Sequence, residues 1–456
     1  MKNRILIILG LVVFSAVILL PPIIHGYVYP NIGDDTAAHM NLMDYIGIFA
    51  PEDIIGEQIR YGALYIIGYP LDFLSHIFNV DNDMLFLWFN FIALLGMGLT
   101  LFFIFKSLIG LYAGLLALVI PIFTSYSILQ LFYSGVIFEI INLGIILPLA
   151  VYCTIKWLIT KKKRFAFGAI GLSLLFAVFH STGVYLPFMA IAGIFAFIVY
   201  KLVNKQTISR RGLLGVGVVC IGITVVILLS PIRINLIQAM AVPSIGISGL
   251  ALLQKSFFYY LSYYVLVILI VSGGLLIVKY KLILPYEKLT VLIFSILGAV
   301  MLPAILFGLS PQPFRQGIDL AIFLSLLAVA LLGILIRLDV YRMLTFALVG
   351  LAISGAFFNI NGWFGYNSAL EKVDIEAIHY INSLSGESYS SSDNVDLWIY
   401  SRFIEKQYLP SGGDIVVVRN VPMRSKVKLV GDGDLTKDKV LVCSFVEGEV
   451  EIIIYK

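Results

Sequence analysis

The stretch "LAIFLSLLAVALLGILI", residues 320–336, has no charged side chain and is flanked by Asp319 and Arg337. A membrane-spanning helix needs about 20 mostly apolar residues, because irregular backbone cannot satisfy its hydrogen bonds in lipid. The run therefore predicts a span at 318–337, and similar runs predict spans at 5–24, 84–105, 110–127, 136–159, 165–180, 184–202, 212–230, 256–278, 289–308 and 343–358. With 60% hydrophobic and 13% charged residues in 456, the sequence predicts a polytopic α-helical membrane protein with about 11 transmembrane helices.

The distribution of Lys and Arg predicts how these spans are oriented. With the N-terminus inside, the predicted cytoplasmic segments before residue 359 hold 17 Lys and Arg, and the opposite face holds four. This asymmetry is the one that the positive-inside rule describes. The sequence therefore predicts a multi-pass protein of the plasma (cytoplasmic) membrane, with the N-terminus inside and the C-terminal segment outside.

Two segments do not have the composition of a bilayer span. Residues 25–83 contain nine acidic residues and one basic residue, and include "YGALYIIGYPLDFLSHIF", whose mixed character predicts helices lying in the membrane interface. Residues 359–456 are polar, and about 80 residues suffice for a small independent domain. We therefore expect a transmembrane domain over 1–358, with the external loop 25–83, and an extracytoplasmic α+β domain over 359–456.

The pattern of the tail predicts its elements. "DIEAIHYINSL" and "VDLWIYSRFIEKQYL" are typical of short helices, whereas "DIVVVRN", "KVKLVG", "KVLVCSFV" and "VEIIIYK" are typical of strands. The Ser-rich "YSSSD" at 389–393 predicts a surface loop. Ten Lys and Arg against fourteen acidic residues make the tail mildly acidic, so a nucleic-acid partner is not expected.

Acidic residues follow the first predicted span in "NIGDDTAAHM", residues 31–40. If this stretch is helical, Asp35 and His39 lie one turn apart on one face, where a carboxylate and an imidazole can share a divalent ion or orient a base. The alternative is that Asp34 or Asp35 only caps the N-terminus of an interfacial helix.

Other ionisable residues are predicted at the same external boundary. Glu139 is the one acidic residue of the fourth span, and an intramembrane carboxylate is costly enough to indicate function. His180 ends the fifth span and is either a ligand or an interfacial hydrogen-bonding group. Arg315 precedes the tenth span and either binds phosphate or pairs with Asp319 one turn later. Arg233 is a second candidate for a phosphate contact.

These residues come from separate regions of the chain, yet the predicted topology places them at one depth: Asp34, Asp35, His39, Glu139, His180 and Arg315. Acids that abstract a proton or hold a metal, together with a cation for phosphate, suit a reaction between a lipid-phosphate donor and an external acceptor.

The chain resembles the GT-C superfamily of membrane glycosyltransferases, which includes oligosaccharyltransferase catalytic subunits and protein O-mannosyltransferases. The resemblance lies in the N-inside first helix, the long first external loop, the external C-terminal domain, and the motifs "GDDTAAHM", "YSGVIFEIINLGIILPLAVY", "FHSTG" and "PFRQGIDLAIFLSLL". It implies an inverting transfer of a sugar from a polyprenyl-phosphate donor to a glycan, lipid or protein acceptor. It also implies a divalent metal, Mg²⁺ or Mn²⁺, as the cofactor.

The resemblance also implies roles for particular residues. Asp34 or Asp35 corresponds to the catalytic base or metal ligand, and Arg315 to the arginine on the donor phosphate. Glu139 corresponds to the second acidic motif of the oligosaccharyltransferases, but this chain has one acid where a pair is typical. The tail has no acceptor-recognition motif of the WWD type, which argues against an N-glycosylating oligosaccharyltransferase.

Two other functions are compatible with a many-spanned chain. A transporter or flippase of lipid-linked saccharides also carries intramembrane charges, but these charged candidates gather at one face, and no paired Gly/Pro-interrupted segments suggest an inverted repeat. A noncatalytic scaffold of the GT-C type would bind a polyprenyl-phosphate sugar without turnover.

Overall fold

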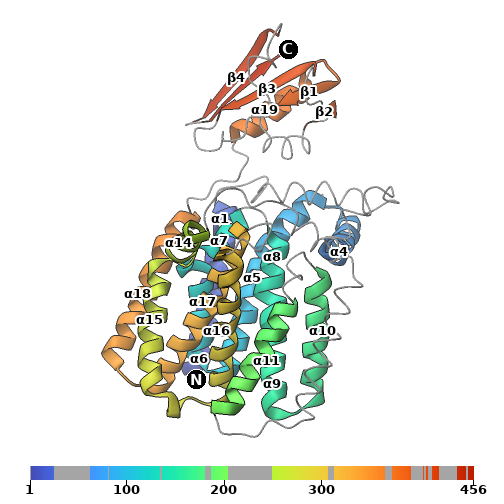
Figure 1. Cartoon of the computed structure of the whole chain (residues 1–456). Helices are drawn as coiled ribbons and strands as arrows, with labels where there is room; N and C mark the ends of the chain where they lie inside the picture. The colour runs from blue at the N-terminus through green and yellow to red at the C-terminus, as the bar shows by residue number, and fades with distance from the viewer. Residues whose placement is uncertain are drawn as a thin grey trace.

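A helical bundle and a small sheet-containing unit make up the computed structural model of the chain (Figure 1). The structure describes residues 2–24, 62–80, 82–133, 136–179, 186–203, 249–306, 313–364, 372–391, 404, 407–408, 413–420, 439–447 and 450–456. The predicted span at 212–230, most of the first external loop and the predicted strand "KVKLVG" lie outside these residues.

The bundle is built from helices that follow the apolar runs of the sequence. Their bounds are α1 Lys2–Ile24, α4 Gly62–Phe78, α5 Asn82–Leu108, α6 Leu111–Val119, α7 Ser127–Tyr133, α8 Ile137–Ile141, α9 Leu147–Thr160, α10 Lys163–Phe179, α11 Leu186–Val203, α14 Gly249–Lys255, α15 Tyr263–Val278, α16 Pro285–Leu306, α17 Pro313–Leu338 and α18 Arg342–Phe364. Short π-helical segments join some of them: η1 Ile120–Thr124, η2 Asn142–Ile146 and η4 Ser256–Tyr260; η5, Tyr280–Leu282, is a 3-10 turn.

The described helices include five that are long and apolar enough to cross a membrane, or six if one bent pair counts as a single span. The long ones fall within the predicted spans 84–105, 136–159, 289–308, 318–337 and 343–358, give or take a few residues. Helix α17 is apolar on all sides and almost wholly buried, so it forms the centre of the bundle. The multi-pass helical character is confirmed, whereas α1 and α6 with η1 are shorter apolar helices.

The predicted span at 256–278 is broken into two helices. Its two halves, Leu253–Tyr260 and Tyr263–Val278, meet at 96°. The break falls at Ser262, which has a positive φ of 70° and whose Oγ donates a hydrogen bond to the Thr124 carbonyl at 2.7 Å. The Tyr126 amide donates to the Tyr260 carbonyl at 2.9 Å. Backbone groups freed by a break inside a bundle need such partners, and η1 and α7 supply them here.

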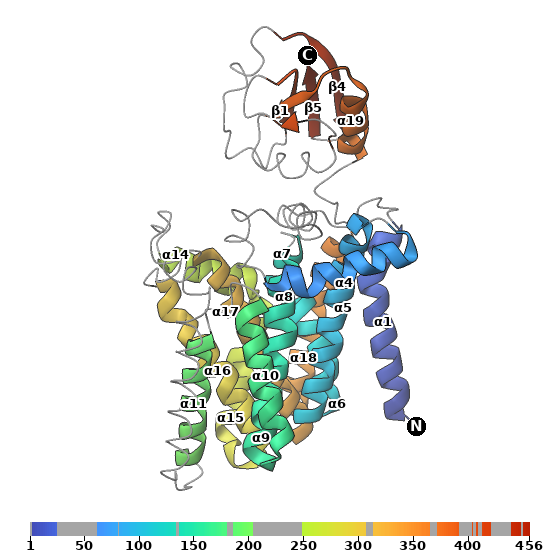
Figure 2. The same cartoon turned by 90° about the vertical axis from the view of Figure 1, so that its right-hand side faces the viewer.

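The bundle has two distinct ends in Figure 1. At one end α1 begins, and short connections link α5 to α6, α9 to α10, α15 to α16 and α17 to α18. We call this end the turn end. We call the opposite end, where α8 begins and beyond which the C-terminal strands lie, the sheet end. Helix α4 lies across the sheet end in Figure 2, within the segment expected to hold interfacial helices.

The C-terminal unit is a five-stranded mixed sheet with one described helix, α19, Lys372–Ser383. The strands are β1 Ser388–Ser391, β2 Gln407–Tyr408, β3 Ile415–Asn420, β4 Leu441–Glu447 and β5 Val450–Tyr455, in the order β2-β1-β3-β5-β4. Strand β1 is parallel to β2 and β3, and β5 is antiparallel to β3 and β4. Helix α19 packs on the sheet, with the rings of Tyr380 and Phe445 5.7 Å apart.

Two expectations for the tail are wrong. The predicted surface loop at 389–393 begins as strand β1, in which Tyr389 and Ser390 are fully buried. The predicted helix over 395–409 does not extend to its last residues, because Gln407 and Tyr408 pair with β1. The predicted strands containing β3, β4 and β5, and the predicted helix containing α19, are confirmed.

Asp414 closes the turn between α19 and β1. Its Oδ2 accepts hydrogen bonds from the amides of Glu387 and Ser388, at 2.9 and 3.1 Å, and from the Ser388 hydroxyl at 3.0 Å. Gly386, just before this turn, has a positive φ of 144°. These hydrogen bonds hold the pKa of the Asp414 carboxyl below its usual value. The bond from the Glu387 amide contributes most, and the bonds from Ser388 contribute less.

Acid should loosen this turn. A carboxylate with a lowered pKa in the folded chain stabilises it above the unfolded pKa of about 3.9, and this contribution is lost as pH falls through the folded pKa. We expect amide exchange at Glu387 and Ser388, corrected for intrinsic rates, to speed up below about pH 4. In Asp414→Asn the exchange should already be fast at neutral pH. Protection in the wild type that does not change on acidification would contradict this.

Candidate functional site

Most residues that the sequence predicts for the site lie outside the described part of the chain. These are Asp34, Asp35, His39, His180 and Arg233. Helix α1 ends at Ile24 at the sheet end (Figure 1), and Asp34 follows ten residues later in the sequence. His180 directly follows Phe179, the last residue of α10, at the same end. Arg315 lies in the first turn of α17, and only its backbone is described.

Glu139 is described and is fully buried in α8. Its neighbour Phe138 packs between Phe86 of α5 and Phe179 of α10, with ring centroids 6.0 and 6.2 Å apart. The helix then continues as the π-helical segment η2, a distortion that often occurs at functional sites. A carboxylate in an apolar bundle is costly, so Glu139 stays a candidate functional residue.

Asn142 connects this helix to the end of α10. It follows Glu139 by three residues, so the two side chains lie close to one face. Its Nδ2 donates a hydrogen bond to the Phe176 carbonyl at 3.2 Å. The last turn of α10, which leads directly to His180, is therefore tied to the helix that carries Glu139.

Asn90 of α5 is a buried polar residue that the sequence reasoning missed. It is fully buried, and within the described part of the chain neither its Oδ1 nor its Nδ2 has a hydrogen-bond partner. It shares a helix face with Leu94, Met97 and Leu101, at spacings of four, seven and eleven residues. That face meets η2, because a Cβ on Gly144 would lie 2.6 Å from Met97 Sδ. Asn90 therefore lies on the face of α5 that is turned toward the helix of Glu139.

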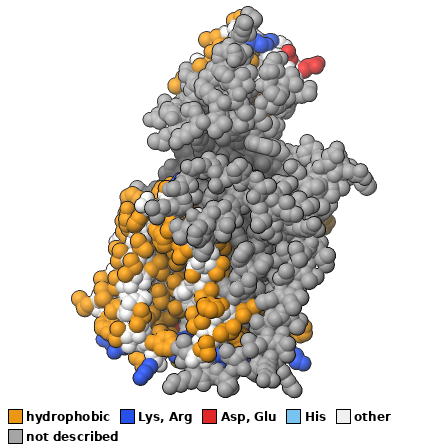
Figure 3. Space-filling model, in the orientation of Figure 1, with side chains coloured by type: hydrophobic (Ala, Val, Ile, Leu, Met, Phe, Trp, Pro, Cys, Tyr) orange, Lys and Arg blue, Asp and Glu red, His pale blue; other side chains and the backbone are white. Residues whose placement is uncertain are grey.

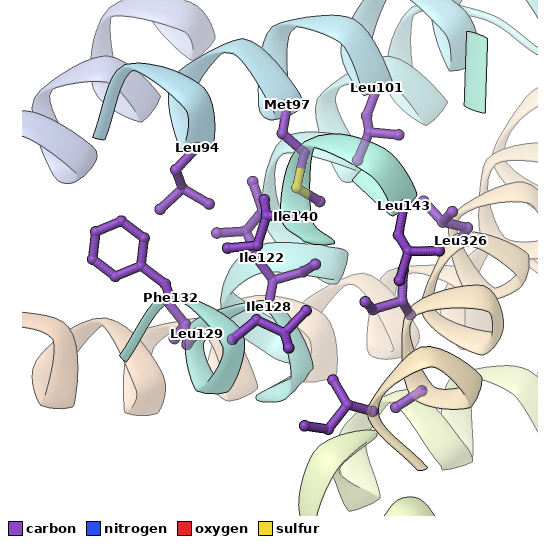
Figure 4. Packing of buried hydrophobic residues seen from close by; sticks show 14 of the residues in the cluster. Leu94, Met97, Leu101, Ile122, Ile128, Leu129, Phe132, Ile140, Leu143 and Leu326 are labelled. Carbon is purple, nitrogen blue, oxygen red and sulfur yellow. The ribbon is translucent and has the colours of Figure 1, made fainter. Parts of the chain in front are cut away.

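Asp319 of α17 is a further polar residue that is fully buried. It precedes Leu326 by seven residues, or two helical turns on the same face. Figure 4 shows Leu326 beside Leu143 of η2, in one apolar cluster with Leu94, Met97 and Leu101 of α5 and Ile140 of α8. We call this cluster the apolar floor.

Three helices thus lead from the apolar floor to the sheet end, and each has a fully buried polar side chain on that side of the floor. Helices α5, α8 and α17 all run from the sheet end toward the turn end (Figure 1). Asn90 and Glu139 lie about one turn before the floor residues Leu94 and Leu143, and Asp319 lies two turns before Leu326. The structure therefore brings Asn90, Glu139 and Asp319 to the same side of the floor. The ion pair expected between Asp319 and Arg315 stays a prediction.

The start of α17 is held against the bent helix pair. Gly317, two residues after Arg315, approaches Ser256 of η4 so closely that a Cβ would lie 2.4 Å from its Oγ. Ser125 Oγ, on the neighbouring turn, donates to the Tyr260 carbonyl at 3.0 Å and is 2.7 Å from Ser127 Oγ. These contacts fix the backbone that presents Arg315 at the sheet end.

A metal site is not assembled by the described residues alone. They contain no group of three or more His, Cys, Asp or Glu side chains that is suited to hold an ion. Glu139 is the described member of the predicted set, and Asp34, Asp35, His39 and His180 lie outside the described residues. Binding of Mg²⁺ or Mn²⁺ therefore stays a prediction.

Comparisons with known proteins show the fold of the chain. No protein-family model and no curated protein matches the sequence. The apo crystal structure of the Archaeoglobus fulgidus oligosaccharyltransferase is similar with a TM-score of 0.60 and 11% identity, over 89% of this chain and 64% of that one. The structure of the oligosaccharyltransferase AglB from the same organism, with an inhibitory peptide and a dolichol-phosphate, has a TM-score of 0.51 and 11% identity, over 88% and 64%.

The likeness confirms the predicted architecture in its coarser form. This chain spans somewhat less than two thirds of the length of both solved proteins. At 11% identity the similarity concerns the fold alone, which is similar to that of these two oligosaccharyltransferase structures. Activity must be argued from the site, because one fold hosts many functions.

Proposed function

We propose that this protein is a membrane glycosyltransferase that transfers a sugar from a polyprenyl-phosphate donor to an acceptor at the sheet end of the bundle. The observation that carries the proposal is that α5, α8 with η2, and α17 meet in the apolar floor (Figure 4) and each has a fully buried polar side chain on the sheet-end side of it, namely Asn90, Glu139 and Asp319. A carboxylate inside a membrane bundle is costly, which makes it a candidate functional group. The AglB structure with a dolichol-phosphate supports a lipid-phosphate ligand for this fold.

The proposed reaction is an inverting displacement. Asp34 or Asp35 removes the proton of the acceptor hydroxyl, whose oxygen forms a bond to the anomeric carbon as the bond from that carbon to the phosphate oxygen breaks. The departing polyprenyl phosphate carries the electron pair and is stabilised by Arg315, with Arg233 as a second candidate. A divalent metal held by the carboxylates, with His39 or His180, would supply further stabilisation of the phosphate charge.

The positions of the described residues support a donor site at the sheet end of the bundle. Polyprenyl chains are apolar and their phosphate is charged, so a donor needs an apolar region next to polar groups. The apolar floor beside Asn90, Glu139 and Asp319 offers this combination. The sheet end is also where α1 and α10 end, before Asp34 and His180 in the sequence, and where α17, with Arg315 in its first turn, begins.

Release of the lipid phosphate tests the proposal directly. The full chain, purified into lipid nanodiscs, is incubated with a panel of polyprenyl-phosphate sugars and with peptide, glycan and lipid acceptors. We expect polyprenyl phosphate to appear with at least one donor, together with a glycosylated acceptor. Chelation of divalent ions, followed by addition of Mg²⁺ or Mn²⁺, tests the metal.

The same preparation separates the alternatives. Movement of an intact lipid-linked saccharide across a proteoliposome membrane, without cleavage, would contradict the transfer reaction and identify a flippase. Tight donor binding with no product across the whole panel would identify a noncatalytic scaffold.

A further inference from the structure

A cavity of about 520 Å³ lies away from the proposed site, between α11, α15, α16 and α17. Its volume falls within the range of about 300–1,000 Å³ that is typical of small-molecule sites. Most of its wall is aliphatic, and the polar side chains that line it are Tyr200, Tyr280, Lys288 and Ser295. Among these lining residues there is one cation and no acid.

The polar part of the cavity lies at the turn end of the bundle. Tyr280 belongs to η5 in the connection between α15 and α16, Lys288 to the first turns of α16, and Tyr200 to the last turn of α11. Lys288 Nζ lies 4.2 Å from the ring centroid of Tyr280, in a cation–π contact. This contact places the ammonium group at the turn-end part of an otherwise apolar cavity.

The apolar part of the cavity extends along the spans and opens toward the membrane. Leu324, Leu327 and Leu331 of the central helix α17 form its inner wall. On its outer side Ile270 and Ile277 of α15 are 66% and 79% exposed, which in a spanning helix means exposure to lipid chains. The cavity is therefore accessible from the bilayer.

We propose that this cavity binds an anionic glycerophospholipid, with an acyl chain against α17 and the phosphate at Lys288. Charge complementarity selects the lipid. Lys201, Lys279 and Lys281 lie at the same end as Lys288, and Figure 3 shows Lys and Arg side chains along this edge of the bundle below its hydrophobic side. Cations next to tyrosines at the end of a bundle match the anionic headgroup level of a membrane.

The phospholipid site is separate from the proposed transfer site. Lys288 and Tyr280 lie at the turn end, whereas Asn90, Glu139 and Asp319 lie toward the sheet end. A lipid bound here would fill the space between α11 and the central helices and stabilise their packing. Its binding needs no sugar donor and is measured without turnover.

Removal of the charge of Lys288 tests the headgroup contact. The full chain in detergent is titrated with phosphatidylglycerol or phosphatidylcholine, and retained lipids are counted by native mass spectrometry. Lys288→Gln should weaken retention of phosphatidylglycerol about fivefold, the contribution of one lysine near an anionic surface, and leave phosphatidylcholine unchanged. Lys106→Gln is the matched control, because Lys106 at the end of α5 stacks over Phe102 and does not line the cavity. Equal retention by wild type and Lys288→Gln, or equal loss in both variants, would overturn the proposal.

Filling the cavity tests the acyl-chain contact. Gly273 lines the cavity, whereas a Cβ on the adjacent Gly274 would have nothing within 4 Å. Gly273→Leu should therefore remove the tightly retained phospholipid, and Gly274→Leu should keep it. Unchanged retention in Gly273→Leu would contradict the site. Preferential retention of an added polyprenyl phosphate, lost in Gly273→Leu, would assign the cavity to the donor chain and overturn the phospholipid assignment.

Discussion

Replacing Glu139 with glutamine should lower sugar transfer by about 100-fold or more, with little change in the amount of folded protein. The amide has nearly the shape of the carboxylate, so the packing of Phe138 against Phe86 and Phe179 should survive. It carries no charge, so it neither balances a cation nor accepts a proton at neutral pH. The measurement is the initial rate of polyprenyl-phosphate release from the donor that the wild type uses.

A control variant separates this effect from a general loss of acidic charge. Glu376→Gln changes an exposed glutamate of α19 in the C-terminal unit, and should transfer sugar at the wild-type rate. Thermal unfolding in the same detergent distinguishes chemistry from structure. If Glu139→Gln unfolds at a lower temperature and still transfers sugar at the wild-type rate, Glu139 is a structural residue and the proposed site is wrong there.

The helical membrane fold follows from the sequence because its cause is local. Each apolar run must satisfy its own backbone hydrogen bonds in lipid, so length and composition predict a helix without knowledge of its neighbours. The bend at Ser262 is different. The run from Ser256 to Val278 contains no proline, and the partners that make the break tolerable, Thr124 and Tyr126, are more than 130 residues away.

Strand β1 was missed for a related reason. "YSSS" has the composition of a turn, but Tyr389 and Ser390 are buried because β1 pairs with β2 on one side and with β3 on the other. A central parallel strand takes its stability from partners distant in the chain, which its own residues do not reveal. The Ser390 hydroxyl also accepts a hydrogen bond from the Gly413 amide at 2.8 Å, a role that is invisible in the sequence.

For the candidate site, the sequence predicts the depth of single residues but not which side chains pack beside them. Topology alone placed Glu139 near one boundary, because its span and orientation follow from local rules. Asn90 is harder to recognise as a site residue from the sequence, because it is a single amide within the apolar run "FLWFNFIALL". Its relevance depends on the rotation of α5 about its axis, which the contact between Met97 and Gly144 determines. Such rotations arise from packing among several helices, so single spans do not predict them.

The largest effect on stability should come from Glu287, at the turn end. Its carboxylate is fully buried and forms a bidentate ion pair with Arg337. Arg337 Nη2 donates to Oε2 at 2.6 Å, and Arg337 Nε donates to Oε1. The Leu284 amide also donates to Oε2, at 2.8 Å, and Arg337 Nη2 reaches the Leu282 carbonyl at 3.3 Å. These bonds join the start of α16 to the end of α17, the central helix. Glu287 therefore holds two spans together where their connecting segments meet.

Removing one partner of this ion pair should lower the free energy of unfolding more than removing both partners. Glu287→Gln leaves Arg337 partly buried without a counter-charge, and we expect a loss of about 3–5 kcal/mol in the free energy of unfolding, measured by denaturant titration in mixed micelles. Glu287→Leu with Arg337→Leu removes both charges and should recover much of that loss, because two apolar side chains replace an ion pair whose desolvation is costly. Asp339→Asn, which breaks the exposed pair with Arg342, should change stability little. A double variant that is less stable than Glu287→Gln would contradict this explanation. The loss in Glu287→Gln would then not arise from Arg337 being left without a counter-charge.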